Sequence, residues 1–319
     1  MSVPEAFRTP RAWRQSLDAR IKAEAKARNR PVSAVRRELA YQRFLARVFT
    51  SGDGGWVLKG GVGLLMRTPT ARHSMDVDLA YASGDEQALQ DLALAVNTDL
   101  GDGLRYLIGN PTPIADAKGF TVSVEAFFAS TTTSFQRFPV DVVTHRATPG
   151  EIEHTTPEPV VRIEQMPELP PFPLYPITAQ IADKVCAVYS TYGADGTQPS
   201  TRFRDLVDLV IIACTQSIDA TTLSSSLTRE AASRDLTLPP RITLPSPRWR
   251  DGYRQQVITA TVPAGFRDVD QAIALVAEFL DPLLSGQEGL GTWTAETQHW
   301  SQATSSHHHQ KADGEKDPR

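Results

Sequence analysis

Hydrophobic positions recur with helical spacing in the first fifty residues. One apolar stripe predicts an amphipathic helix over residues 33–51, formed by Val35, Leu39, Phe44, Leu45 and Val48. Ser33 follows Pro31 and is a suitable N-cap for this helix. The preceding stretch, residues 13–29, is polar and basic, and we expect a second helix there.

From residue 52 onward, short apolar and alternating runs predict a unit that mixes strands and helices. We expect strands at 56–58, 76–81, 104–108, 120–128 and 138–144. Helices are expected at 62–67 and 85–100. This order is typical of an α+β domain.

The second half of the chain is predicted to be helical. Residues 148–176 are rich in proline and indicate an extended connector. Helical spacing then predicts helices at 177–192, 203–215, 219–234 and 268–284. Beyond Ser285 the sequence is polar and irregular, and we expect this tail to be disordered. We interpret its His307-His308-His309 tract as incidental.

These patterns divide the chain into five parts. We expect a basic helical N-terminal segment (1–51), an α+β core (52–147), a proline-rich connector (148–176), a helical C-terminal domain (177–284) and a disordered tail (285–319).

The composition is that of an ordinary globular protein, with 40% hydrophobic and 22% charged residues. No apolar run is long enough to span a membrane, and the N-terminus lacks the apolar core of a signal peptide. Cys186 and Cys214 both lie in apolar helical patterns, which favours free thiols in a reducing compartment. We therefore expect a cytoplasmic protein without a membrane partner.

The net charge of −4 hides an uneven distribution. Residues 1–50 hold twelve Lys or Arg and four Asp or Glu, a balance of +8, so the remainder sums to −12. A basic end on an acidic protein can attract a polyanion such as RNA. A solvated helical face is the alternative explanation.

Two carboxylates stand two residues apart in the motif Ser74-Met75-Asp76-Val77-Asp78-Leu79. On a strand, Asp76 and Asp78 would point to one face, about 7 Å apart. Carboxylates this close repel each other unless a cation lies between them, and Mg²⁺ takes such oxygen ligands. Asp141, alone among apolar neighbours in a predicted strand, is a candidate third metal ligand. The alternative is a chance pair that faces water.

Polar groups near this motif suit a phosphate. Gly60-Gly61 follows an apolar strand, and such a turn lets the backbone offer its N–H groups to a phosphate. Ser74 adds a hydroxyl and Arg72 adds a cation. A simple turn and a surface arginine are the alternative explanations.

The helical half supplies further charged candidates. Lys184 lies on the apolar stripe of its predicted helix, so it either extends outward or reaches an anion in a cleft. Asp205 and Asp208 are i, i+3 neighbours on one helical face. Arg202 and Arg204 could pair with these acids or with phosphate.

Together these residues resemble the AbiEii family, nucleotidyltransferase toxins of bacterial abortive-infection and toxin–antitoxin systems that include the mycobacterial MenT toxins. The resemblance rests on Lys59-Gly60-Gly61, on Arg72-His73-Ser74-Met75-Asp76-Val77-Asp78-Leu79, on Asp183-Lys184 and on the run from Arg202 to Leu209. It covers residues 35–285.

The resemblance implies a polymerase-beta-like nucleotidyltransferase core with a helical C-terminal domain. It also implies Mg²⁺-dependent transfer of a nucleotide from an NTP, a cognate antitoxin and a part in phage defence. Some members add pyrimidine nucleotides to the 3′ acceptor end of tRNA, which stops translation. RNA, and tRNA in particular, is therefore the expected acceptor.

The resemblance also implies roles for single residues. Asp76 and Asp78 would bind metal and act in catalysis, with Asp141 as a weaker third ligand. Lys184 would contact the triphosphate, and Asp205 would orient Lys184 or the acceptor hydroxyl. The expected nucleotide-binding residues are Lys59, Gly60, Gly61, Arg72, Ser74, Lys184, Arg202 and Arg204.

One position departs from the pattern. Many nucleotidyltransferases place Ser or Thr after the second glycine of the turn, whereas this chain has Val62. The turn would then bind phosphate through its backbone alone. Two other functions stay open: transfer of the nucleotide to a protein or small molecule, and non-catalytic binding of nucleotide or RNA.

Overall fold

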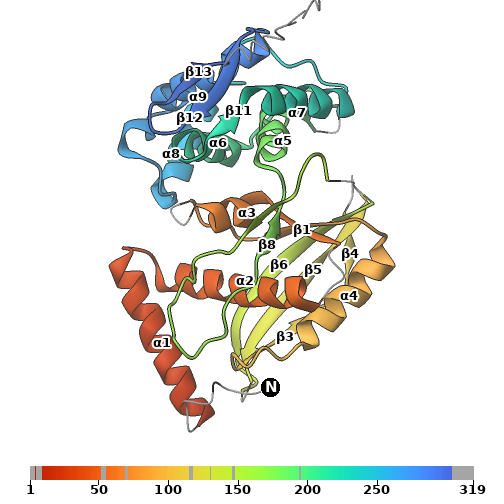
Figure 1. Ribbon diagram of the computed structural model, residues 1–319, viewed down its shortest axis with the longest axis vertical. Helices are drawn as coiled ribbons and strands as arrows, with labels where there is room; N and C mark the ends of the chain where they lie inside the picture. Colours follow the sequence, from red (N-terminus) through yellow and green to blue (C-terminus); the bar gives the residue numbers. More distant parts are fainter. Residues whose placement is uncertain are drawn as a thin grey trace, which may run out of the picture.

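The computed structural model describes residues 4, 9–51, 55–68, 71–114, 118–129, 131–145, 148–193 and 195–303. Figure 1 shows a part built on a sheet below a part built mainly of helices. Residues 307–309, the histidine tract, lie outside the described residues.

Two helices form the basic N-terminal segment. Helix α1 (Pro10–Ala27) begins at Thr9, whose hydroxyl accepts a hydrogen bond from the Ala12 N–H. Helix α1 packs on α2 (Val32–Ser51). Every fourth residue of α1 is buried, and these residues are Trp13, Leu17, Ile21 and Ala25. The segment is therefore part of the hydrophobic core rather than an appended arm.

The core is a mixed sheet whose strand order is β3-β5-β6-β2-β1-β8-β7, with β4 paired to β5. The strands are β1 (Trp56–Lys59), β2 (Val77–Tyr81), β3 (Leu104–Ile108), β4 (Thr112–Pro113), β5 (Gly119–Phe128), β6 (Ser134–Thr144), β7 (Glu153–Thr155) and β8 (Phe172–Leu174). Strand β2 is parallel to β6, and β1 is parallel to β8. Helices α2 and α4 (Asp85–Asn97) lie against the sheet (Figure 1).

The register of the central strands places charged residues side by side. Lys59 on β1 is opposite Asp78 on β2, and Asp78 is opposite Asp141 on β6. Residues paired in this way project from the same face of a sheet. Helix α3 (Gly60–Arg67) starts directly after Lys59.

Helix α2 anchors the loop that leads into β2. Arg30, just before α2, donates a hydrogen bond to the Ala71 carbonyl at 3.2 Å, and Glu38 pairs with His73 Nδ1 at 2.8 Å. The Tyr41 hydroxyl donates to the Ser74 carbonyl at 3.3 Å. The approach to Asp76 is therefore fixed by the N-terminal segment.

Helices dominate the second half: α5 (Ile177–Tyr189), α6 (Phe203–Thr215), α7 (Ala220–Ser233), α8 (Trp249–Thr259) and α9 (Val269–Leu284). The short elements between them are β9 (Thr191–Tyr192), β10 (Gln198–Pro199), β11 (Ile218–Asp219) and a 3₁₀ turn, η1 (Ala264–Phe266). Helix α6 packs against α5, α8 and α9, and it carries nine buried residues.

The prediction that the whole of residues 285–319 is disordered is wrong. Strands β12 (Leu290–Thr294) and β13 (His299–Gln302) form a hairpin that continues the sheet of β11. Trp293 is fully buried, and its indole N–H donates to the Ala213 carbonyl at 2.8 Å. Trp300 donates to the Phe279 carbonyl at 2.9 Å. Two tryptophans thus attach a polar segment to the helical core.

The proline-rich connector is more ordered than an extended linker. It contributes β7 and β8, and β8 joins the central sheet beside β1. Helix α8 lies in a stretch for which no element is predicted from the sequence. Among the described residues, no helix is both long and apolar enough to cross a membrane.

Candidate active site

The turn after β1 requires glycine. Gly60 has a φ of +62°, a conformation that L side chains rarely adopt. A Cβ atom on Gly60 would lie 1.8 Å from Asp78 Oδ2, and one on Gly61 would lie 2.7 Å from Ser74 Oγ. The glycine pair therefore lets the backbone approach the carboxylate motif closely.

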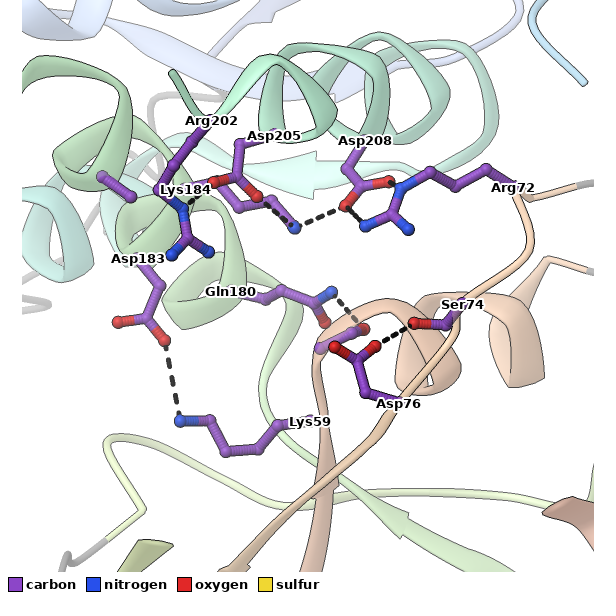
Figure 2. Close-up of polar contacts among 12 residues, drawn as sticks. Lys59, Arg72, Ser74, Asp76, Gln180, Asp183, Lys184, Arg202, Asp205 and Asp208 are labelled. Atoms are coloured by element: carbon purple, nitrogen blue, oxygen red, sulfur yellow. Dashed lines mark hydrogen bonds and ion pairs between the residues drawn. The ribbon is translucent and has the colours of Figure 1, made fainter. Parts of the chain in front are cut away.

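Asp78 lies on β2 close to this turn, and Asp76 lies just before the strand begins. Ser74 Oγ donates a hydrogen bond to Asp76 Oδ1 at 2.6 Å (Figure 2). Burial and, as the second cause, the negative charge of Asp76 together raise the pKa of Asp78 to about 6. A divalent cation bound here would offset the repulsion that Asp78 experiences from Asp76 and would take oxygen ligands from both carboxylates.

Asp141 lies beside this pair in the sheet but outside the cleft. It neighbours Asp78 in register, and Thr121 Oγ1 donates a hydrogen bond to its Oδ1 at 2.5 Å. It does not line the cleft that holds Asp76 and Asp78. In the described part of the chain, no group of three His, Cys, Asp or Glu residues could hold a metal ion. The role of Asp141 as a third metal ligand stays a prediction.

Lys184 meets two carboxylates across the cleft. Its ammonium donates to Asp205 Oδ1 at 3.0 Å and to Asp208 Oδ2 at 2.6 Å (Figure 2). Burial alone would lower the pKa of Lys184, but the charges of Asp208 and Asp205 outweigh burial and raise it. The lysine therefore stays charged inside the fold.

Arg72 joins the two halves of the molecule. Its Nε and Nη2 donate to the two carboxylate oxygens of the fully buried Asp208, at 2.7 and 2.8 Å. This bidentate pairing is the strongest geometry for Arg and a carboxylate. Asp208 was not among the predicted site residues, although the i, i+3 spacing from Asp205 places both on one face.

The other predicted cations surround this centre. Lys59 Nζ lies 4.0 Å from Asp183 Oδ2, and Arg202 Nε donates to Asp205 Oδ2 at 2.6 Å. Arg204 Nε donates to Gln256 Oε1 at 3.2 Å.

Several cleft residues were not among the predicted site residues, and three of them make polar contacts described here. Gln180 donates to the Gly60 carbonyl at 2.9 Å and so ties α5 to the glycine turn. Arg234 pairs with Asp183 at 3.0 Å. The third is Gln256 on α8.

Apart from Asp141 and Asp208, these groups line one cleft between the sheet and the helices, with a volume of about 610 Å³. Its lining holds six Lys or Arg and four Asp side chains, so its formal charge is positive. The residues are Lys59, Gly60, Gly61, Arg72, Ser74, Asp76, Asp78, Tyr175, Gln180, Asp183, Lys184, Ala187, Thr201, Arg202, Phe203, Arg204, Asp205, Arg234 and Gln256. Every predicted site residue except Asp141 is among them.

The family model described as "Nucleotidyl transferase AbiEii toxin, Type IV TA system" matches residues 43–274. The chain belongs to the AbiEii family. Among solved structures, the MenT4 nucleotidyltransferase toxin of Mycobacterium tuberculosis is 16% identical, with a TM-score of 0.47. That match covers 81% of this chain and 98% of MenT4.

JHP933 from Helicobacter pylori is 18% identical, with a TM-score of 0.44, and the match covers 79% of this chain and 92% of JHP933. No curated protein matches the chain.

Membership of the AbiEii family confirms the predicted family. With the mixed α/β structure, it also confirms the predicted fold class. The chain is thus a nucleotidyltransferase toxin with a nucleotide substrate, and its type IV toxin–antitoxin system includes an antitoxin partner. The roles of individual residues in the AbiEii cleft stay predictions.

Proposed function

We propose that this toxin transfers a nucleotide from an NTP to the 3′ hydroxyl of RNA, at the acceptor end of tRNA. The observation that carries the proposal is one cleft in which Asp76 and Asp78 face Lys184 across the two halves of the molecule. In the reaction, the RNA 3′ oxygen bonds to the α-phosphorus while the bond to the β-phosphate oxygen breaks. Pyrophosphate leaves with the electron pair, and the hydroxyl proton passes to water.

Such a transfer depends on positioning and on positive charge around the phosphates. Lys184 would hold the triphosphate, and the glycine turn would let the backbone approach it. Asp76 and Asp78 would hold Mg²⁺, and their mutual repulsion and oxygen donors fit that ion. When bound, Mg²⁺ would neutralise developing charge on the phosphates.

RNA as the acceptor is supported by a cation beside the aspartates. Arg37 on α2 contacts the sulfur of Met75, which lies between Ser74 and Asp76 and is 52% exposed. Arg36 differs, because it lies over the Phe135 ring and 3.7 Å from Asp18. We infer that Arg37 would contact a backbone phosphate of the acceptor strand.

The test is incubation with labelled NTPs, Mg²⁺ and total tRNA, with Asp76→Ala as the inactive control. Label on the 3′ end of tRNA, lost in the variant, supports the proposal. Label confined to protein or small metabolites selects the alternative acceptor class. Binding of NTP without any turnover would indicate a non-catalytic relative.

A second experiment tests the RNA surface. Arg37→Glu should weaken RNA binding and reduce its dependence on salt, because a phosphate contact releases counterions. Arg36→Glu is the matched control on the same helix and should have the smaller effect. Equal RNA affinity and equal salt slopes for wild type and Arg37→Glu would refute this placement.

A further inference from the structure

One end of the cleft differs chemically from the rest. Around the aspartates, the cations are paired with carboxylates, as in the Lys184–Asp205 and Arg72–Asp208 pairs. Arg204 is paired instead with the neutral amide of Gln256. The Gln256 oxygen is a hydrogen-bond acceptor, as phosphate oxygens are, so it adds nothing to the binding of a triphosphate. A neutral amide beside the guanidinium suits a neutral ligand group better.

An aromatic side chain lines the same cleft as Arg204 and Gln256. Phe203 belongs to the cleft lining, next in sequence to Arg204. Its ring contacts Trp249 of α8 edge to face, with 5.1 Å between centroids. A flat apolar ring beside a planar guanidinium and a planar amide is the set of groups that recognises a nucleobase.

The fold holds Gln256 firmly beside Arg204. A Cβ atom on Gly252 of α8 would lie 2.4 Å from the Phe203 ring, so α8 packs closely on the start of α6. The Trp249 indole N–H donates to the Ser200 carbonyl at 2.9 Å. Gln256 follows Gly252 by one helical turn, which brings its amide to Arg204.

The guanidinium of Arg204 has donors besides the Nε that bonds to Gln256. Its Nε is used by Gln256 Oε1, and within the described residues its two terminal nitrogens have no hydrogen-bond or ion-pair partner. Two neighbouring donors match a base edge with two adjacent acceptors. Cytosine offers O2 and N3, and guanine offers O6 and N7, whereas adenine and uracil alternate donors with acceptors on their pairing edges.

We propose that Arg204 reads the base of the incoming NTP and that Gln256 positions its guanidinium, so that the cleft selects cytosine or guanine. This inference rests on the proposed nucleotidyl transfer. Arg204 is a specificity-determining residue here, and Gln256 is a positioning residue.

The experiment compares kcat/KM for CTP, GTP, ATP and UTP in transfer to tRNA. Binding of non-hydrolysable analogues of the four nucleotides is measured alongside. Wild type should prefer CTP or GTP over ATP and UTP by about tenfold to a hundredfold, the discrimination of one bidentate arginine contact. Whichever of the two is preferred identifies the base.

Arg204→Lys retains the charge but loses the planar fork, so the advantage of CTP or GTP over ATP and UTP should largely disappear. Gln256→Ala should weaken the preference, and Gln256→Glu, which keeps an acceptor for Arg204 Nε, should retain it. Arg254→Ala is the control, an exposed arginine on α8 that pairs with Asp251.

Three results would overturn the inference: no base preference in wild type, a preference for ATP or UTP, or an equal loss for all four nucleotides in Arg204→Lys. The last would assign Arg204 to the phosphates. Absence of transfer from any NTP in wild type is a separate result that refutes the proposed function, while the binding measurement still tests base selection.

Discussion

Substituting Gly60 by alanine should lower the rate of nucleotide transfer far more than it lowers the stability of the fold. The added Cβ would lie 1.8 Å from Asp78 Oδ2, where real contacts stay beyond 3.0 Å. The Asp78 carboxylate must therefore move by more than an ångström. Metal–ligand distances tolerate only about 0.2 Å, so the displaced carboxylate could no longer serve as a ligand.

The two expected effects differ in size. The positive φ of Gly60 costs an alanine about 1–2 kcal/mol of folding free energy, which lowers the melting temperature by a few degrees. Misplacing a reacting group by an ångström costs about 100-fold in rate. We expect kcat/KM for nucleotide transfer to fall by about 100-fold or more at a temperature where the variant is fully folded.

Gly63→Ala is the matched control on the same helix. A Cβ there meets the Leu58 carbonyl oxygen at 3.4 Å, an ordinary contact, and alanine within a helix gains about 0.5–1 kcal/mol over glycine. This variant should keep both stability and activity. If Gly60→Ala transferred nucleotide as fast as Gly63→Ala, Asp78 would have no role as a positioned ligand.

Three further predictions concern pH and packing. Because the pKa of Asp78 is raised to about 6, Mg²⁺ must displace a proton at lower pH; affinity should fall about tenfold per pH unit below 6 and level off above 7, and a flat profile from pH 5 to 8 would contradict this. Asp102 is buried and accepts hydrogen bonds from Arg47 and Arg43 of α2. Burial alone would raise the pKa of Asp102, but these two arginines outweigh burial and lower it. Its stabilisation is therefore complete above the unfolded value of about 4 and lost as pH falls through the folded value; Asp102→Asn should cost about 3–5 kcal/mol at pH 7 and flatten the acid limb in urea unfolding. Gly252→Val should destabilise by about 1–3 kcal/mol by pushing on the Phe203 ring, whereas Gly265→Val, with nothing within 4 Å, should leave the melting temperature nearly unchanged.

The central strands and most helices were predictable because each carries its own period. Strand β6 alternates buried and more exposed residues from Phe138 to Thr144. Helix α2 carries apolar residues at helical spacing, although the fold buries every residue from Glu38 to Val48. Helix α8 was missed although Trp249, Tyr253 and Val257 are buried at four-residue spacing. Its other residues are largely polar and include a glycine, so the average composition masked the stripe.

The hairpin of β12 and β13 was missed in the sequence for a different reason. Its residues are mostly polar, and its order depends on Trp293 and Trp300 docking on α6 and α9. A pattern confined to the segment does not reveal a partner 80 residues away. The same holds for Arg204 and Gln256, which are separated by 52 residues and meet only because α8 packs on α6.

Arg72 and Lys184 are both predicted from the sequence to bind nucleotide, but their partners in the structure differ. Arg72 donates through Nε and Nη2 to both oxygens of the buried Asp208. Breaking a buried ion pair of this kind costs about 3–5 kcal/mol, although Lys184 would still pair with Asp208. We therefore expect Arg72 to hold the two halves together rather than to bind phosphate. An ammonium has three donors, and Lys184 uses one on Asp205 and one on Asp208. In the part of the chain that the structure describes, its third donor has no partner, and we expect it to bind a phosphate oxygen while the two aspartates orient the lysine.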